Sequence, residues 1–187
     1  MNNKFPGSKI SAPLTIIAIS GFAGSGKNTV SRIIAKTLDW RVVEPTFKTL
    51  AEREGITLME FQARAHSDFD IDKKFDDALV EEAREGNCVI ATWLGPWMAP
   101  GKPFRVWLEA SQEVRSKRLV GREGVTQADA LMHIQKRDED NILRYKKVYG
   151  IDISNHSGFD LVVDAGSKTP DEISTQIISA FNSARAR

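Results

Sequence analysis

The stretch of residues 21–29, Gly-Phe-Ala-Gly-Ser-Gly-Lys-Asn-Thr, constrains the fold of this chain more than any other segment. It follows an apolar run over residues 14–20, and it precedes a segment whose apolar residues recur at helical spacing: Val30, Ile33, Ile34 and Leu38. A buried strand, a glycine-rich loop and a helix in this order are typical of a phosphate-binding loop. Glycines let such a loop turn tightly and approach an anion, which the N–H groups at the start of the helix attract.

Lys27 strengthens this interpretation, because it supplies a mobile cation for the outer phosphates of a bound ligand. We expect phosphate contacts from seven residues of the loop: Gly21, Gly24, Ser25, Gly26, Lys27, Asn28 and Thr29. The usual pattern has serine or threonine directly after the lysine, as a ligand of Mg²⁺. Here Asn28 takes that position, and the hydroxyl follows at Thr29. The alternative is a glycine-rich turn between a strand and a helix that binds nothing.

The composition agrees with one globular domain and argues against several classes of protein. A chain of 187 residues can bury a sizeable core, and its net charge of +1 gives no strong attraction to nucleic acid or membranes. No apolar run approaches ~18 residues, so no membrane span is expected. The single cysteine, Cys88, lies in an apolar run, which predicts a buried thiol in a reducing compartment. We expect a loose tail over residues 1–13, a single domain over residues 14–187, a cytoplasmic location and a monomer.

Five strand candidates alternate with helical segments along the chain: residues 14–20, 41–43, 87–92, 104–108 and 159–164. This alternation predicts an α/β fold of three layers, α/β/α, in which a five-stranded parallel sheet is covered on both faces. Ligands of such sheets bind at the carboxyl ends of the strands, where the phosphate-binding loop lies. Residues 94–103, which are rich in proline, are expected to form a rigid aromatic loop.

Residues 121–150 are rich in charge and poor in large aliphatic side chains, which predicts two mostly exposed helices. Arg118 and Arg122 are four residues apart and Arg137 and Arg144 are seven apart, so each pair shares one helix face. Next to a phosphate-binding loop, such a segment predicts a lid that excludes water and places guanidinium groups on a transferring phosphoryl group. The alternative is a solvated helix face, because acidic residues are mixed in.

Several motifs follow the phosphate-binding loop in a characteristic order: Phe47-Lys48, residues 51–55, residues 70–73, Val114-Arg115, Arg118, Arg122-Glu123-Gly124, Arg137-Asp138, Arg144-Tyr145 and residues 149–152. This succession resembles the nucleoside monophosphate kinases, and most closely the cytidylate kinases of archaeal type. The resemblance covers about residues 15–178. It implies the fold of the P-loop NTPases, and transfer of the γ-phosphoryl group of ATP to CMP or dCMP with Mg²⁺.

The resemblance also implies roles for residues. The loop would hold the phosphates of ATP, with Thr29 as the ligand of Mg²⁺. Arg118 and Arg122 match the arginines of the family's lid, so Arg118 is expected to bind ATP. Arg137 and Arg144 match a pair that contacts phosphate and the ribose of the acceptor.

We therefore expect four catalytic cations: Lys27, Arg122, Arg137 and Arg144. Residues 44–86 correspond to the acceptor-binding region, and residues 121–150 to the lid. Phosphoryl transfer needs positioning and neutralised charge more than a nucleophilic side chain.

The acceptor side departs from the family pattern. Lys48 stands in place of an arginine, Asn141 in place of an acid near the ribose, and residues 91–93 are Ala-Thr-Trp in place of an acid, a small residue and an arginine. We expect Lys48, Asp72, Trp93 and Asn141 to contact the acceptor, with Trp93 or Trp97 stacked on the base and Asp72 or Asp76 at its edge. Packing of Trp93 against the sheet edge and a solvated position for Asp72 are the alternatives. A kinase for another small acceptor, and an ATP-binding protein with weak or no kinase activity, also stay open.

Overall fold

The computed structural model describes residues 15–45, 47–57, 59–61 and 70–186, with the backbone alone at 47, 48 and 70–72. The predicted tail over residues 1–13 lies outside this part of the chain, as do the side chains of Lys48 and Asp72. None of the helices within the described ranges is long and apolar enough to cross a membrane.

Five parallel strands form the sheet, as predicted. They are β1 (Ile16–Ser20), β2 (Arg41–Val43), β3 (Cys88–Ala91), β4 (Phe104–Glu109) and β5 (Leu161–Asp164). Their order across the sheet is β2-β3-β1-β4-β5, so β1 lies in the middle. The phosphate-binding loop therefore leaves the sheet at its centre, where two neighbouring strands end beside it.

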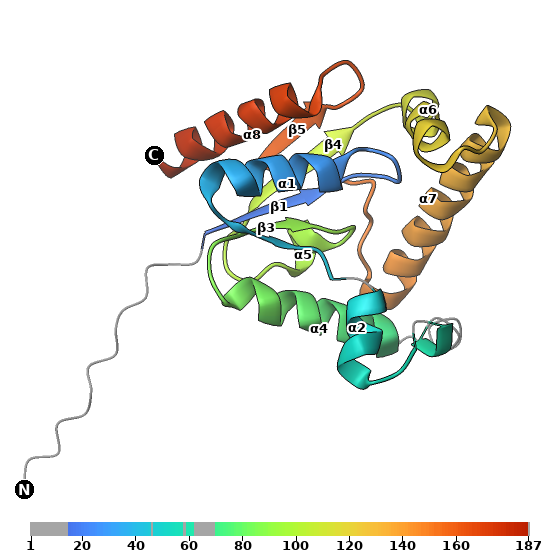
Figure 1. The fold of residues 1–187 in the computed structure, drawn as a ribbon. Coiled ribbons are helices and arrows are strands. Elements are labelled where there is room, and N and C mark those ends of the chain that lie inside the picture. The colour runs from blue at the N-terminus through green and yellow to red at the C-terminus, as the bar shows by residue number, and fades with distance from the viewer. Residues whose placement is uncertain (1–14, 46, 58, 62–69, 187) are drawn as a thin grey trace, which may run out of the picture.

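Helices cover both faces of the sheet, which confirms the predicted three layers (Figure 1). Helices α1 (Lys27–Leu38) and α8 (Pro170–Arg185) lie on one face, and α4 (Asp70–Arg84) and α5 (Gly95–Met98) lie on the other. Side chains of a strand alternate between the faces. Ile17 and Ile19 accordingly join the core beneath α1 and α8, while Ile16 and Ala18 join the core beneath α4.

The structure corrects two predicted elements. The segment expected to be a rigid loop contains the short helix α5, which has Pro96 in its first turn, where proline lacks only an N–H that needs no partner. The insert expected to form two helices is almost wholly one helix, α7 (Gln127–Tyr149). Gly121 does not end the preceding helix α6 (Gln112–Glu123), and no glycine or proline interrupts α7.

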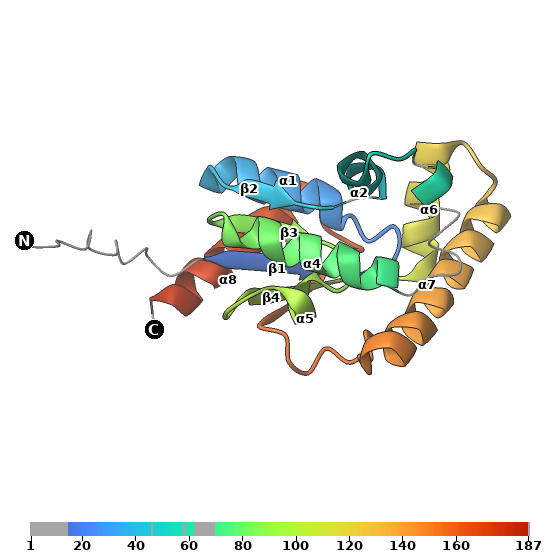
Figure 2. The same cartoon turned by 90° about the horizontal axis from the view of Figure 1, so that it is seen from below.

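Helices α6 and α7 pack against each other beyond the end of the sheet at which β1 stops (Figures 1 and 2). Helix α2 (Phe47–Glu54) approaches the same end from the side of α4. Side-chain caps fix where α6 and α7 begin, because Ser111 accepts from the N–H of Val114 and Thr126 accepts from the N–H of Asp129. Three helical elements thus surround the carboxyl ends of the strands.

Candidate active site

The phosphate-binding loop joins Ser20 at the end of β1 to Lys27 at the start of α1. Gly24 and Gly26 have φ angles of +78° and +93°, in the left-handed region that favours glycine. A Cβ atom on Gly24 would also lie 2.8 Å from the carbonyl oxygen of Arg115. The loop therefore needs glycine here for its conformation and for its close approach to α6.

Ser25 lies inside the loop rather than on its surface. Its N–H donates to the carbonyl oxygen of Phe22 over 3.1 Å, and within the described residues its buried hydroxyl has no hydrogen-bond partner. Thr29, by contrast, is exposed at the first turn of α1.

Lys27 folds back over its own loop. Its Nζ donates to the carbonyl oxygen of Gly21 over 3.3 Å and lies 5.0 Å from the centre of the Trp93 ring. Burial, followed by the positive charge of Arg137, lowers the pKa of Lys27 to about 8. The ammonium group is therefore short of negative partners, which a bound phosphate would supply.

A cavity of about 420 Å³ lies along the loop and the first turn of α1. Gly24, Gly26 and Thr29 form one wall, and Arg122 and Arg137 reach it from α6 and α7. This wall of backbone N–H groups and cations suits the phosphates of a nucleotide. We call it the donor cavity.

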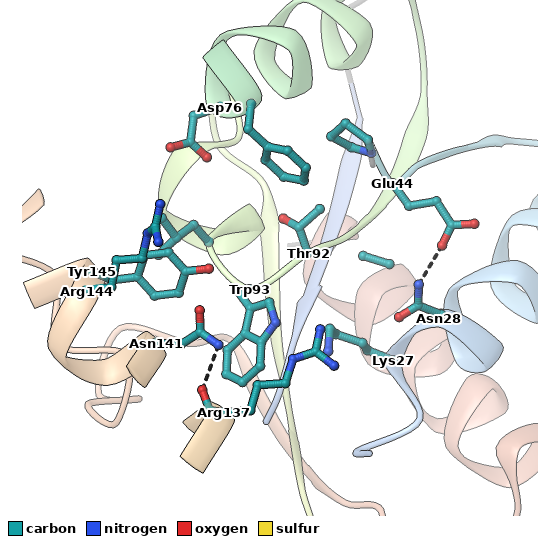
Figure 3. Close-up of a pocket in the computed structure, with 14 residues that line it drawn as sticks. Lys27, Asn28, Glu44, Asp76, Thr92, Trp93, Arg137, Asn141, Arg144 and Tyr145 are labelled. Atoms are coloured by element: carbon teal, nitrogen blue, oxygen red, sulfur yellow. Dashed lines mark hydrogen bonds between the residues drawn. The ribbon is translucent and has the colours of Figure 1, made fainter. Parts of the chain in front are cut away.

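A second cavity, of about 410 Å³, opens between α4, the end of β3 and α7 (Figure 3). Phe75 and Asp76 come from α4, and Arg144 and Tyr145 come from α7. Trp93 lines it, together with the other residues that follow β3: Ala91, Thr92 and Leu94. We call it the acceptor cavity. It has three aromatic rings and two arginines, counting Arg137 at its edge, in reach of one small anionic ligand.

The two cavities meet. Lys27, Asn28 and Arg137 line both of them. The amide of Asn28 donates to Glu44 over 2.7 Å, and Arg32 forms an ion pair with the same carboxylate at 2.6 Å. An acid that follows β2 thus holds Asn28 in place. At this position, which usually carries a hydroxyl, an amide side chain lines the junction of the two cavities.

The predicted arginines separate into two groups. Arg122, Arg137 and Arg144 line the cavities, and the exposed Arg122 pairs with Glu123 at 2.6 Å. Arg118 instead donates to the carbonyl oxygens of Ser25, at 3.1 Å, and of Ala165. Its guanidinium group therefore braces the loop from behind.

Two of the four predicted acceptor contacts lie at the acceptor cavity, and the other two have side chains outside the described part of the chain. Trp93 and Asn141 line the acceptor cavity, and the amide of Asn141 donates to the carbonyl oxygen of Arg137 over 2.7 Å. The ring of Trp93 also packs edge-on against the ring of Phe22, with 6.1 Å between the ring centres. Trp93 therefore both lines the cavity and packs against the loop. The contacts predicted for Lys48 and Asp72 stay untested, since these side chains lie outside the described part of the chain.

Sequence reasoning missed a buried ion pair behind the loop. Arg115 Nη1 lies 2.7 Å from Asp138 Oδ2, and both side chains contact Ala23. A signal was present, because Ala130, Ile134 and Asp138 are spaced by four residues on one face of α7. An aspartate that continues an apolar stripe predicts a buried charge with a partner.

Comparison with known proteins identifies the family. Residues 16–167 match the model of the cytidylate kinase-like family. Cytidylate kinase from Ignicoccus hospitalis is 39% identical over 163 residues, which cover 86% of this chain and 95% of that protein. Cytidylate kinase from Pyrococcus furiosus is 36% identical over 169 residues, 89% of this chain and 88% of that one.

The fold is also shared with a solved kinase. The crystal structure of a gluconokinase from Sinorhizobium meliloti superposes with a TM-score of 0.58 at 18% identity, covering 92% of this chain and 93% of that one. At this identity the likeness concerns the fold alone. The family model and the sequence relatives show that the chain belongs to the cytidylate kinase-like family, a family of nucleoside monophosphate kinases built on the P-loop fold.

Proposed function

We propose that this chain transfers the γ-phosphoryl group of ATP to CMP or dCMP, giving ADP and CDP or dCDP. The observation that carries the proposal is the junction of two cavities at Lys27, Asn28 and Arg137. Phosphoryl transfer needs donor and acceptor in line and their charges neutralised. Two nucleotide-sized cavities that meet can align the donor with the acceptor, and the two cations at their junction can neutralise the phosphate charges. The relatives named cytidylate kinase favour a cytosine nucleotide as the acceptor.

On the donor side, the loop backbone and Lys27 hold the phosphates of ATP, while Arg122 neutralises the outer phosphate. Mg²⁺ fits this cavity because it prefers phosphate oxygens, waters and few protein ligands. The exposed hydroxyl of Thr29 lines the cavity, and the described residues hold no cluster of acids and histidines that would trap a metal elsewhere. We assign Thr29 as the protein ligand of Mg²⁺, whose charge would lower the repulsion between phosphates.

On the acceptor side, Arg137 and Arg144 bind the phosphate and ribose of CMP. Trp93 stacks on the base, and Asn141 lies toward the ribose. We retain Lys48 and Asp72 as acceptor contacts on the strength of the family pattern. The phosphate of CMP is already an anion, so its attack on the γ-phosphorus requires no general base from the protein.

A substrate panel tests the proposal. ADP release from ATP is measured with CMP, dCMP, UMP, AMP and GMP, and we expect the highest kcat/KM with CMP or dCMP. Lys27→Ala should remove turnover, since it deletes the cation at the junction. Lys36→Ala is the matched control, because Lys36 is exposed on the same helix and lines neither cavity. Wild-type protein that releases no ADP with any of the five nucleotides contradicts the proposal.

The absence of the expected arginine at position 93 favours a second candidate, a kinase for another small acceptor. An aromatic ring stands here where the resemblance leads one to expect an arginine, so the cavity suits a flat or apolar group. Base–aromatic stacking is worth about 1–3 kcal/mol. If Trp93 stacks on cytosine, Trp93→Ala should raise KM for CMP about tenfold or more, and KM for ATP less than about twofold. An unchanged KM for CMP, with turnover of a non-nucleotide acceptor, favours this second candidate.

We further propose a monomeric, cytoplasmic enzyme. The buried Cys88 supports a reducing compartment, and burial raises the pKa of its thiol to about 11, which leaves it unreactive. Light scattering coupled to gel filtration tests the monomer directly.

A further inference from the structure

The apex of the phosphate-binding loop is clamped by a buried ion pair from α6 and α7. The side chains of Arg115 and Asp138 are only 4% and 8% exposed. The N–H of Ala23 donates to Asp138 Oδ1 over 3.1 Å, and its carbonyl oxygen accepts from Arg115 Nη1 over 2.9 Å. Both peptide groups of one loop residue are therefore held by charged side chains from two different helices.

The clamp has a fixed geometry on the side of α6. Arg115 Nε donates to the carbonyl oxygen of Ala110 over 3.0 Å, which orients the planar guanidinium group. The guanidinium carbon also lies 5.4 Å from the centre of the Phe22 ring, and Gly24 packs on the backbone of Arg115. Three successive loop residues, 22–24, therefore contact a single arginine.

On the side of α7, the clamp sets the position of Arg137. Asp138 occupies the buried face of the helix, while the preceding residue, Arg137, lines both cavities. Neighbouring residues of a helix point about 100° apart around its axis. Fixing Asp138 against the loop therefore fixes both the rotation of α7 and the distance from the loop to Arg137.

We propose that Asp138 and Arg115 are positioning residues for phosphoryl transfer. They line neither cavity. They act through the loop apex and Arg137, holding Lys27 and Arg137 in one arrangement around the transferring group. Because this carboxylate and guanidinium are buried and joined, the part of α7 near Asp138 is a fixed support for the loop. The inference rests on the proposed phosphoryl transfer.

Asp138→Asn is the sharpest variant, because it keeps an oxygen for the N–H of Ala23 and almost the same volume. It puts an amide NH2 in place of the oxygen that accepts from Arg115, so the charge and that one hydrogen bond are lost together. A displacement of about 1 Å can cost about 10²-fold in rate. We expect kcat to fall by about 30–100-fold, while KM for ATP and the Kd of ADP change by less than about threefold.

Two comparisons separate positioning from mere stability. Glu113→Gln is the matched control, since it removes the exposed ion pair of Glu113 with Lys117 on α6 and should leave kcat unchanged. In the double variant Asp138→Asn/Arg137→Met, the loss of kcat should be clearly smaller than the product of the two single losses, because part of the effect of Asp138 passes through Arg137. Losses in kcat that multiply, or a wild-type kcat per folded molecule in Asp138→Asn, overturn the inference.

Amide hydrogen exchange at Ala23 tests the clamp independently of turnover. Wild-type protein that transfers phosphoryl to no nucleotide refutes the proposed function, and exchange at Ala23 then decides on the clamp. In Arg115→Lys, which keeps the charge and loses the fork, we expect the N–H of Ala23 to exchange at least tenfold faster than in the wild type. Unchanged exchange at Ala23 in both Arg115→Lys and Asp138→Asn overturns the clamp.

Discussion

At the scale of single residues, Lys27 is a partly buried cation whose charged form a bound phosphate should stabilise. Its pKa falls from 10.5 to about 8 because burial and Arg137 disfavour the ammonium form. Between these pH values the unfolded chain holds the proton and the folded protein does not. The unfavourable effect of Lys27 on stability is therefore present below pH 8 and fades as the pH rises toward 10.5. A bound phosphate should raise the pKa of Lys27 again, because it favours the charged form.

Nucleotide binding should consequently take up a proton through Lys27 near pH 8.5. Titration calorimetry with ADP in two buffers of different ionisation enthalpy measures this uptake. We expect a positive uptake, approaching one proton at most, that vanishes in Lys27→Met. Equal apparent enthalpies in the two buffers for the wild type would show that the lysine does not meet the phosphates.

Residue roles were predictable where a local pattern defines the chemistry. The glycines and Lys27 form such a pattern, and the structure places Lys27 at the junction of the cavities. The clamp was not predicted, because Arg115 and Asp138 are 23 positions apart and the apolar stripe that marks Asp138 as buried does not identify its partner. Only the packing of α6 on α7 shows that the two are buried together.

At the scale of elements, α7 connects the two cavities to the core. Ala130 and Ile134 are buried in a small cluster with Leu119 of α6 and Ala23 of the loop. Leu143, on the same helix, is 68% exposed. The helix is thus anchored in its first half, whereas its second half carries acceptor contacts with less support from the core.

Shortening a buried side chain of α7 should lower the stability of the protein. Removing a buried isoleucine side chain typically costs about 2–5 kcal/mol, so we expect Ile134→Ala to lower the free energy of unfolding by that amount. Leu143→Ala is the control on the same helix and should change it by less than about 0.5 kcal/mol. Urea unfolding followed by circular dichroism gives both values. Similar losses for the two variants would mean that α7 is not anchored through its buried face.

Most elements could be predicted because their signals are local. Thr169 and Glu172 have the three-residue spacing of a capping box, and at the start of α8 both of its reciprocal hydrogen bonds are present. The length of α7 was predicted wrongly, because two helices were expected over residues 121–150 and no glycine or proline interrupts α7. Its burial also depends on α6, a tertiary contact that the period of the sequence alone does not reveal.

At the scale of the whole molecule, the parallel sheet brings the ends of separate segments to one edge. β1 delivers the phosphate-binding loop, β3 delivers Trp93, and α6 and α7 close the space beyond them (Figures 1 and 2). The strand order was not predicted, but the parallel sheet followed from the alternation of strands and helices. The meeting of the two cavities did not, because it depends on how α4 and α7 pack around that edge.

The central claim is that one phosphoryl group passes between two cavities joined at Lys27 and Arg137. A bisubstrate compound, with adenosine and cytidine linked through five phosphates, tests it most directly in a calorimetric titration. We expect one molecule to bind per chain, at least 10³-fold tighter than ADP, and prior saturation with either ADP or CMP should weaken this binding. Binding no tighter than that of ADP, or binding that CMP does not weaken, would contradict a continuous site.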